Sequence, residues 1–175
     1  MLKQRIKISP NFFLDEFLSP KIYEKLFLGK EDYWQGVIDK KDGTFYKLFF
    51  NGIRLEKLVR IAQFVRDKYG KSVIINNWGS GGDLVNSGVR DLDSTEGAPK
   101  SAHKDWYAID IKVIDVDERD IFSNVVANPK TWMEVGVTEI EENTWSRVTG
   151  EGWSHLSIRP TGLSIIKVIG FWKKK

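Results

Sequence analysis

The chain contains two histidines, His103 and His155, and no cysteine. Any transition-metal site must therefore use imidazole and carboxylate ligands, because thiolates are absent. Asp110 stands seven residues after His103, and two imidazoles with one carboxylate are enough to hold a catalytic zinc ion with one position open for water. From the residues alone, surface or hydrogen-bonding roles for these side chains stay open as the alternative.

Two predicted strands position Asp110 and His155. Polar and apolar residues alternate over 106–113, and Asp110 falls on the face opposite the apolar set. His155 falls on the non-core face of a second alternating segment, 153–158. Both side chains are therefore expected to point away from the hydrophobic core.

His103 lies at the end of a long polar segment that begins at Gly79 and reaches roughly to Lys100. Loops of that length are uncommon in compact domains unless they are functional or mobile. The other expected elements, in chain order, are a helix capped by Ser19-Pro20, a helix from an Asn51 cap to a Gly70 stop, a strand at 72–77, a helix with an Asp115 and Glu118 capping box that ends before Pro129, and strands at 135–142 and 164–169.

The length and composition predict one domain of the α+β class. The 175 residues are 41% hydrophobic and 13% aromatic, which can fill a single sizeable core. We expect that domain to span 1–175, with a small antiparallel sheet carrying the site and helices packed on one side. Residues 1–30 are expected to form an N-terminal helical segment and residues 170–175 a basic tail.

The charge pattern argues against nucleic acid as a partner. The formal charge is only +3, acidic and basic residues are interspersed, and no stripe of basic and aromatic residues occurs. The N-terminus lacks the features of a secretory signal, and no apolar run approaches transmembrane length. We therefore expect synthesis in the cytoplasm without stable membrane insertion, and leave the oligomeric state open.

Four segments resemble one family of enzymes. The segment Ser101-Ala-His103-Lys-Asp-Trp-Tyr-Ala108-Ile-Asp110 resembles the metal-binding signature of the M15 peptidases, which are D-alanyl-D-alanine and L-alanyl-D-glutamate peptidases related in fold to the hedgehog signalling domain. Trp153-Ser-His155-Leu-Ser-Ile is similar to their second ligand strand. Residues 74–90 resemble the strand and Gly-x-Arg loop of phage-type members, and residues 11–17 resemble the short N-terminal helix of many phage proteins.

The resemblance implies roles for five residues. It makes His103, Asp110 and His155 the ligands of a Zn2+ cofactor. Arg90 becomes a candidate for binding a substrate carboxylate or carbonyl. Ser101 becomes a hydrogen-bonding residue close to the metal or the substrate.

The general base is the role for which the sequence departs from the family pattern. Several members carry an acid three residues before the second histidine, where this chain has Gly152. Two glutamates are substitutes: Glu141, which could lie beside His155 across a hairpin, and Glu151. We rank Glu141 slightly higher because hedgehog-like and phage-like members place the acid on a neighbouring strand. Trp106 is a second departure, since the family commonly has glycine there.

The function implied by the resemblance is zinc-dependent hydrolysis of peptide bonds in the stem peptides of bacterial peptidoglycan. A phage endolysin or virion-associated lysin that acts on the cell wall would fit this activity. The alternative is a non-catalytic zinc-binding or cell-wall-binding module of the same fold, which the departures at Gly152 and Trp106 favour. Which stem-peptide bond is cleaved, and in which type of wall, stays open.

Overall fold

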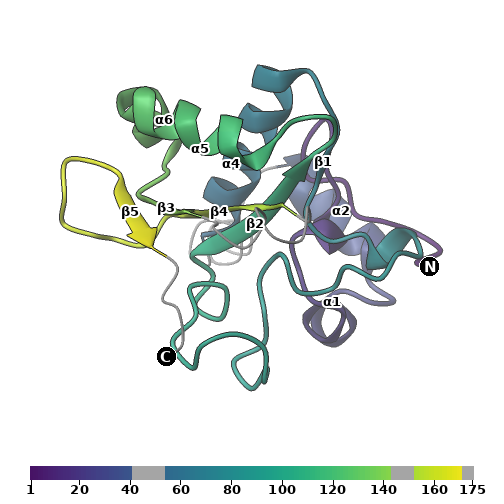
Figure 1. Ribbon diagram of the computed structural model, residues 1–175. Helices are drawn as coiled ribbons and strands as arrows, with labels where there is room; N and C mark the ends of the chain where they lie inside the picture. The colour runs from purple at the N-terminus through teal and green to yellow at the C-terminus, as the bar shows by residue number, and fades with distance from the viewer. Residues whose placement is uncertain (41–53, 143–151, 171–175) are drawn as a thin grey trace.

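A five-stranded sheet crosses the middle of the molecule in the computed structural model, which describes residues 1–40, 54–142 and 152–170 (Figure 1). The strand order is β1-β2-β4-β3-β5. The strands are β1 (Val73–Ile74), β2 (Ala108–Val113), β3 (Glu139–Glu142), β4 (Ser154–Ser157) and β5 (Lys167–Gly170). The helices are α1 (Pro20–Leu26), α2 (Glu31–Lys40), α4 (Leu55–Tyr69), α5 (Glu118–Ala127) and α6 (Pro129–Val135), with short 3-10 turns η1 (Leu14–Glu16) and η3 (Trp78–Ser80).

The sheet is mixed, which corrects the expectation of an antiparallel one. Neighbouring strands from β1 through β2 and β4 to β3 are antiparallel, but β5 runs parallel to β3. The physical reason is the connection: residues 158–166 pass over β3, so β5 starts beside Glu139, at the end where β3 also starts. The coarser prediction of a single α+β domain is confirmed.

Helices α4, α5 and α6 lie over one face of the sheet, as expected (Figure 1). The longest of them, α4, turns a fully apolar side toward β1 and β2, and its hydrophobic residues recur at helical spacing. The buried residues of that helix are Leu55, Leu58, Ile61, Ala62 and Val65. The core therefore lies between these helices and the sheet, which leaves the opposite face for polar side chains.

Two of the predicted helix ends are confirmed and one cap is corrected. Ser19 caps α1 by accepting a hydrogen bond from the Ile22 N–H, and Gly70 ends α4 with a φ of 61°. The cap of α5 is Asp117, not Asp115, because Asp115 occupies a turn with a φ of 59° two residues earlier. Helix α4 begins directly after Arg54, and the expected cap Asn51 lies outside the described residues.

The strand expected over 135–142 begins later than predicted. Pro129 starts a separate helix, α6, which runs to Val135 and ends at Gly136 with a φ of 112°. Proline at the first helical position and glycine just past the end are the usual boundaries of a helix. Only Glu139–Glu142 is left to form β3.

A partly buried ion pair lies within the N-terminal segment, and its carboxylate reaches the rest of the domain. Arg5 donates from Nε and Nη2 to the carboxylate of Asp15 at 2.9 and 2.7 Å, and Asp15 is fully buried. That carboxylate lies against Gly79, where a Cβ would come within 2.0 Å of it. In the described part of the chain, no helix combines the length and apolar character needed to span a bilayer.

Candidate metal centre

The strand register brings the predicted polar side chains into one row on the face opposite the helices. Asp110 of β2 pairs directly with His155 of β4. The β3–β4 register, with Ile140 opposite Leu156, places Glu141 on the other side of His155. Side chains opposite each other in neighbouring strands have Cβ atoms about 4.5–5.5 Å apart. The sheet therefore positions an acid on each side of the imidazole.

His103 completes a compact group of three ligand atoms. Its Nε2 lies 3.2 Å from His155 Nδ1 and 3.2 Å from Asp110 Oδ1, and His155 Nδ1 lies 2.8 Å from the same oxygen. Metal bonds of about 2.0–2.1 Å in tetrahedral geometry place ligand atoms about 3.3 Å apart. The three side chains thus fit a zinc ion, and among the described residues they form the one such group.

The outer nitrogen of His103 fixes the tautomer that this site requires. His103 Nδ1 lies 2.8 Å from the backbone carbonyl oxygen of Gly88. Because a carbonyl can only accept, Nδ1 carries the proton and Nε2 presents its lone pair to the centre. His103 is only 3% exposed, so the ring is held by packing as well. A metal-binding histidine oriented by a backbone carbonyl is a common arrangement.

Asp110 and His155 shift each other's pKa in the metal-free protein. Burial alone would raise the pKa of Asp110, but His103 and His155 outweigh burial and lower that pKa well below its ordinary value. Burial lowers the pKa of the His155 imidazole, yet the hydrogen bond and negative charge of Asp110 raise it overall. A cation bound here would compete with a proton for His155, so its binding should weaken as the pH falls.

Arg90 and Ser101 both lie beside the predicted ligands. Arg90 Nη2 is 3.4 Å from Asp110 Oδ2, and Arg90 is largely buried. The hydroxyl of Ser101 accepts a hydrogen bond from the backbone N–H of His103 at 3.4 Å. In this structure Arg90 supports Asp110, and Ser101 supports the turn that carries His103; binding of substrate by either residue stays a prediction.

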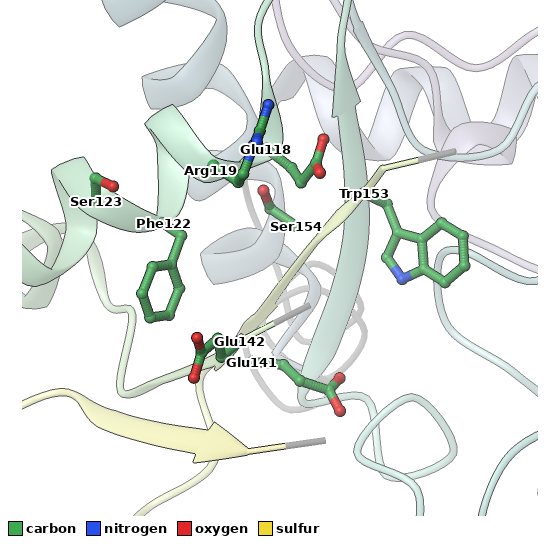
Figure 2. Close-up of a pocket in the computed structure, with 8 residues that line it drawn as sticks. All are labelled: Glu118, Arg119, Phe122, Ser123, Glu141, Glu142, Trp153 and Ser154. Carbon is green, nitrogen blue, oxygen red and sulfur yellow. The ribbon is translucent and has the colours of Figure 1, made fainter. Parts of the chain in front are cut away.

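Glu141 is half-buried and close enough to the triad for its charge to interact with all three side chains. Burial raises the pKa of Glu141, with His155 opposing that rise. The other glutamate on this face, Glu139, accepts hydrogen bonds from Ser157 and Lys167 and is fully engaged. Figure 2 shows that Glu141 and Glu142 leave β3 in opposite directions. Glu141 is therefore the glutamate of β3 that combines partial burial with interaction with all three ligands.

Gly152 lies against the end of the flexible Glu118 side chain. A Cβ at that position would lie 1.8 Å from the Glu118 carboxylate, so any side chain there would displace Glu118. The other candidate base, Glu151, lies outside the described residues.

Trp106 adopts a backbone conformation that favours glycine. Its φ is 62°, in the left-handed region that residues with a Cβ rarely adopt. The ring packs against the core and lines a hollow of about 360 Å³ that Arg90 also borders. The residue thus closes the turn between His103 and β2 at a conformational cost, and its side chain stands beside the centre without entering the group of ligand atoms.

An open cleft borders the centre on its solvent side. Two adjoining hollows of about 330 and 340 Å³ share Asp83, Leu84, Ser87, Asp110 and Trp153 in their walls. Trp153 is 37% exposed, so its ring forms an accessible wall next to Asp110.

A separate pocket lies behind the sheet. It has a volume of about 310 Å³ and is formed mainly where α5 meets the ends of β3 and β4 (Figure 2). Phe122 and Ser123 of α5 line it, together with Ser154, whose side chain faces the helices. Glu141 and Trp153 line it as well, and Trp153 also forms a wall of the cleft in front, whereas none of the three predicted ligands lines this pocket.

Sequence reasoning missed the residues that act through their backbone. The carbonyl groups of Ser87 and Gly88 contact two of the predicted ligands, at the Asp110 N–H and the His103 ring. A backbone carbonyl has no side-chain identity, so only the Ser87-Gly88-Val89-Arg90 motif as a whole pointed to this segment. Asn76, a buried amide two residues after β1, belongs to the segment 74–90, but no motif there indicates a role for its side chain.

Comparison with known proteins adds no family to this picture. No family model matches the chain, and neither the curated proteins nor the solved structures give a match. What the chain does must therefore be argued from the geometry of His103, Asp110 and His155 and from the sequence motifs that contain them.

Proposed function

We propose that the protein is a zinc-dependent peptidase that hydrolyses stem peptides of bacterial peptidoglycan, with a fold related to that of the D-alanyl-D-alanine peptidases and the hedgehog domain. One observation carries the proposal: His103, Asp110 and His155 converge with ligand atoms 2.8–3.2 Å apart beside an open cleft. These are also the residues through which the sequence resembles that family. A phage endolysin or virion-associated lysin is the biological setting that suits such an activity.

The residues around the centre divide the proposed reaction between them. Zinc held by the three ligands would activate a water molecule and polarise the scissile carbonyl. Glu141, beside His155, accepts the proton of the attacking water and later delivers it to the leaving amine. Arg90, on the cleft wall and next to Asp110, supplies positive charge toward a substrate carboxylate or carbonyl.

The competing proposal is a non-catalytic module that binds zinc or the cell wall. Two observations favour it: Arg90 already contacts Asp110, and Trp106 occupies a turn position that glycine would fill without strain. The two proposals share the metal centre and differ only in turnover.

Titration of the metal-free protein with zinc separates these proposals. We expect hydrolysis of purified peptidoglycan, followed as newly released amino groups, to rise with added zinc and to level off at about one ion per chain. Binding of one ion per chain without release of amino groups would instead support the non-catalytic module. Absence of zinc binding would refute the peptidase and the zinc-binding module, and leave only a module that binds the cell wall.

A further inference from the structure

The segment from Ser87 to Arg90 contacts two of the proposed ligands through its backbone. The Asp110 N–H donates to the Ser87 carbonyl at 2.7 Å, and His103 Nδ1 donates to the Gly88 carbonyl at 2.8 Å. The Arg90 N–H returns a bond to the His103 carbonyl at 3.2 Å. The positions of His103 and Asp110 therefore depend on where this segment lies.

The other side of the same segment rests on the N-terminal chain. The Val89 N–H donates to the Phe17 carbonyl at 2.7 Å, and the Ser19 N–H donates to the Val89 carbonyl at 3.0 Å. Gly88 approaches so closely that a Cβ there would lie 2.4 Å from the Phe17 carbonyl oxygen. The segment is thus held between the N-terminal chain and the metal centre.

Asn76 joins these parts with one side chain. Its Oδ1 accepts from the Ser87 N–H at 2.9 Å, and its Nδ2 donates to the Leu18 carbonyl at 3.2 Å. Its backbone N–H donates to the Glu16 carbonyl at 3.1 Å. Asn76 is 2% exposed, so water cannot replace these bonds, and a lost partner would leave buried polar groups unsatisfied.

We propose that Asn76 is a positioning residue for the metal centre, which it controls by fixing the Ser87–Arg90 segment. This inference rests on the proposed metal site, and it makes the N-terminal chain part of that site's support. Outer hydrogen bonds that orient metal ligands typically change metal affinity by about 10–100-fold when they are removed. Asn76 does not contact a ligand itself. It holds the segment whose backbone carbonyls contact two ligands, His103 and Asp110.

The test compares Asn76→Ala with Asn77→Ala. Asn77 is the matched control, because its Oδ1 accepts a single backbone bond, from Leu84 at 2.8 Å, which fixes a different part of the loop. Affinity for Zn2+ is measured by competition with a chelator, at a temperature where each variant is folded by circular dichroism. The visible absorption of bound Co2+ serves as a second readout, because it reports the geometry of the ligands.

We expect Asn76→Ala to weaken zinc binding by about tenfold or more and to alter the Co2+ spectrum, while Asn77→Ala matches the wild type in both. Wild-type affinity and spectrum in a folded Asn76→Ala protein would overturn the inference and leave the proposed function intact. If Asn76→Ala does not fold, Gly88→Ala decides, since it displaces the same segment by contact with Phe17; unchanged zinc affinity there would overturn the inference. A wild-type protein that binds no zinc would refute the proposed metal site itself.

Discussion

The ligand atoms at the centre are aimed by their surroundings before any metal binds. His103 is held by the Gly88 carbonyl, and Asp110 is held by Arg90 and by the Ser87 carbonyl. His155 is placed by the strand register opposite Asp110. Such preorganisation lowers the conformational entropy that must be lost when an ion binds.

The two histidines should respond differently to truncation. His155→Ala should abolish stoichiometric zinc binding and leave the far-ultraviolet circular dichroism unchanged, because the ring lies on the non-core face. His103→Ala should also abolish zinc binding, and should cost about 1 kcal/mol of stability because the buried Gly88 carbonyl loses its donor. Metal analysis and urea unfolding measure the two effects. Retention of one zinc ion per chain in either variant would contradict the ligand assignment.

Glu141 is the residue on which the proposed proton transfer depends. Glu141→Gln should keep zinc, since the residue is not a ligand, and reduce turnover by roughly 100-fold. Glu142→Gln is the matched control, because the neighbouring side chain leaves β3 in the opposite direction and should have little effect on rate (Figure 2). Equal rates for Glu141→Gln and wild type would reject this base, and loss of activity in Glu151→Gln alone would transfer the role to Glu151.

Among the elements, the sequence predicted helix ends and strands, because capping residues and polar–apolar alternation act over a few neighbouring residues. Ser19-Pro20 and Gly70 marked helix ends, and the alternation before Val113 marked β2. The alternation places Asp110 and His155 on the non-core faces of their strands. For this reason the two residues could be considered as ligands from the sequence. His103 was assigned to a polar loop, yet it is buried, because the Ser87–Arg90 segment covers it from a distance in sequence.

The direction of β5 could not be predicted from local sequence. Alternation indicates a strand but says nothing about its neighbour, and β5 pairs with β3 only because residues 158–166 cross over that strand. The role of Asn76 depends on long-range contacts in the same way. Its partners Glu16 and Leu18 lie about sixty residues earlier, a separation at which spacing in the sequence carries no signal.

Trp106 gives a prediction for the turn that leads into β2. Trp106→Gly and Trp106→Ala both remove the ring, so the difference between them isolates the backbone. Because φ is 62° at this position, the glycine variant should be about 1 kcal/mol more stable than the alanine variant. Urea unfolding at one temperature measures the difference. An alanine variant as stable as the glycine variant would contradict the left-handed conformation.

At the scale of the whole molecule, the N-terminal chain is part of the domain that carries the centre. It contacts the segment after β1 and the Ser87–Arg90 segment through backbone bonds, including a parallel bridge between Leu18 and Val89. Within it, Arg5 pairs with the buried Asp15, whose carboxylate lies against Gly79. Unfolding of this region should therefore be coupled to loss of the metal site.

Breaking that pair tests the coupling. Asp15→Ala leaves Arg5 without its main partner and should destabilise the protein by roughly 3 kcal/mol. Lys21→Ala is the control: it breaks the exposed pair between Lys21 and Asp93 and should leave the unfolding midpoint close to that of wild type. Differential scanning calorimetry compares the two variants. Equal midpoints for Asp15→Ala and wild type would show that the N-terminal chain is not required for a stable domain.

We propose that this molecule cuts stem peptides with the metal centre formed by His103, Asp110 and His155. Mass spectrometry of muropeptides after digestion with the zinc-loaded protein tests it most directly. We predict stem-peptide fragments that differ from intact muropeptides by the products of one hydrolysed peptide bond, and that are absent when His155→Ala is used at the same concentration. Intact muropeptides after digestion with wild-type protein carrying one zinc ion per chain would contradict the claim.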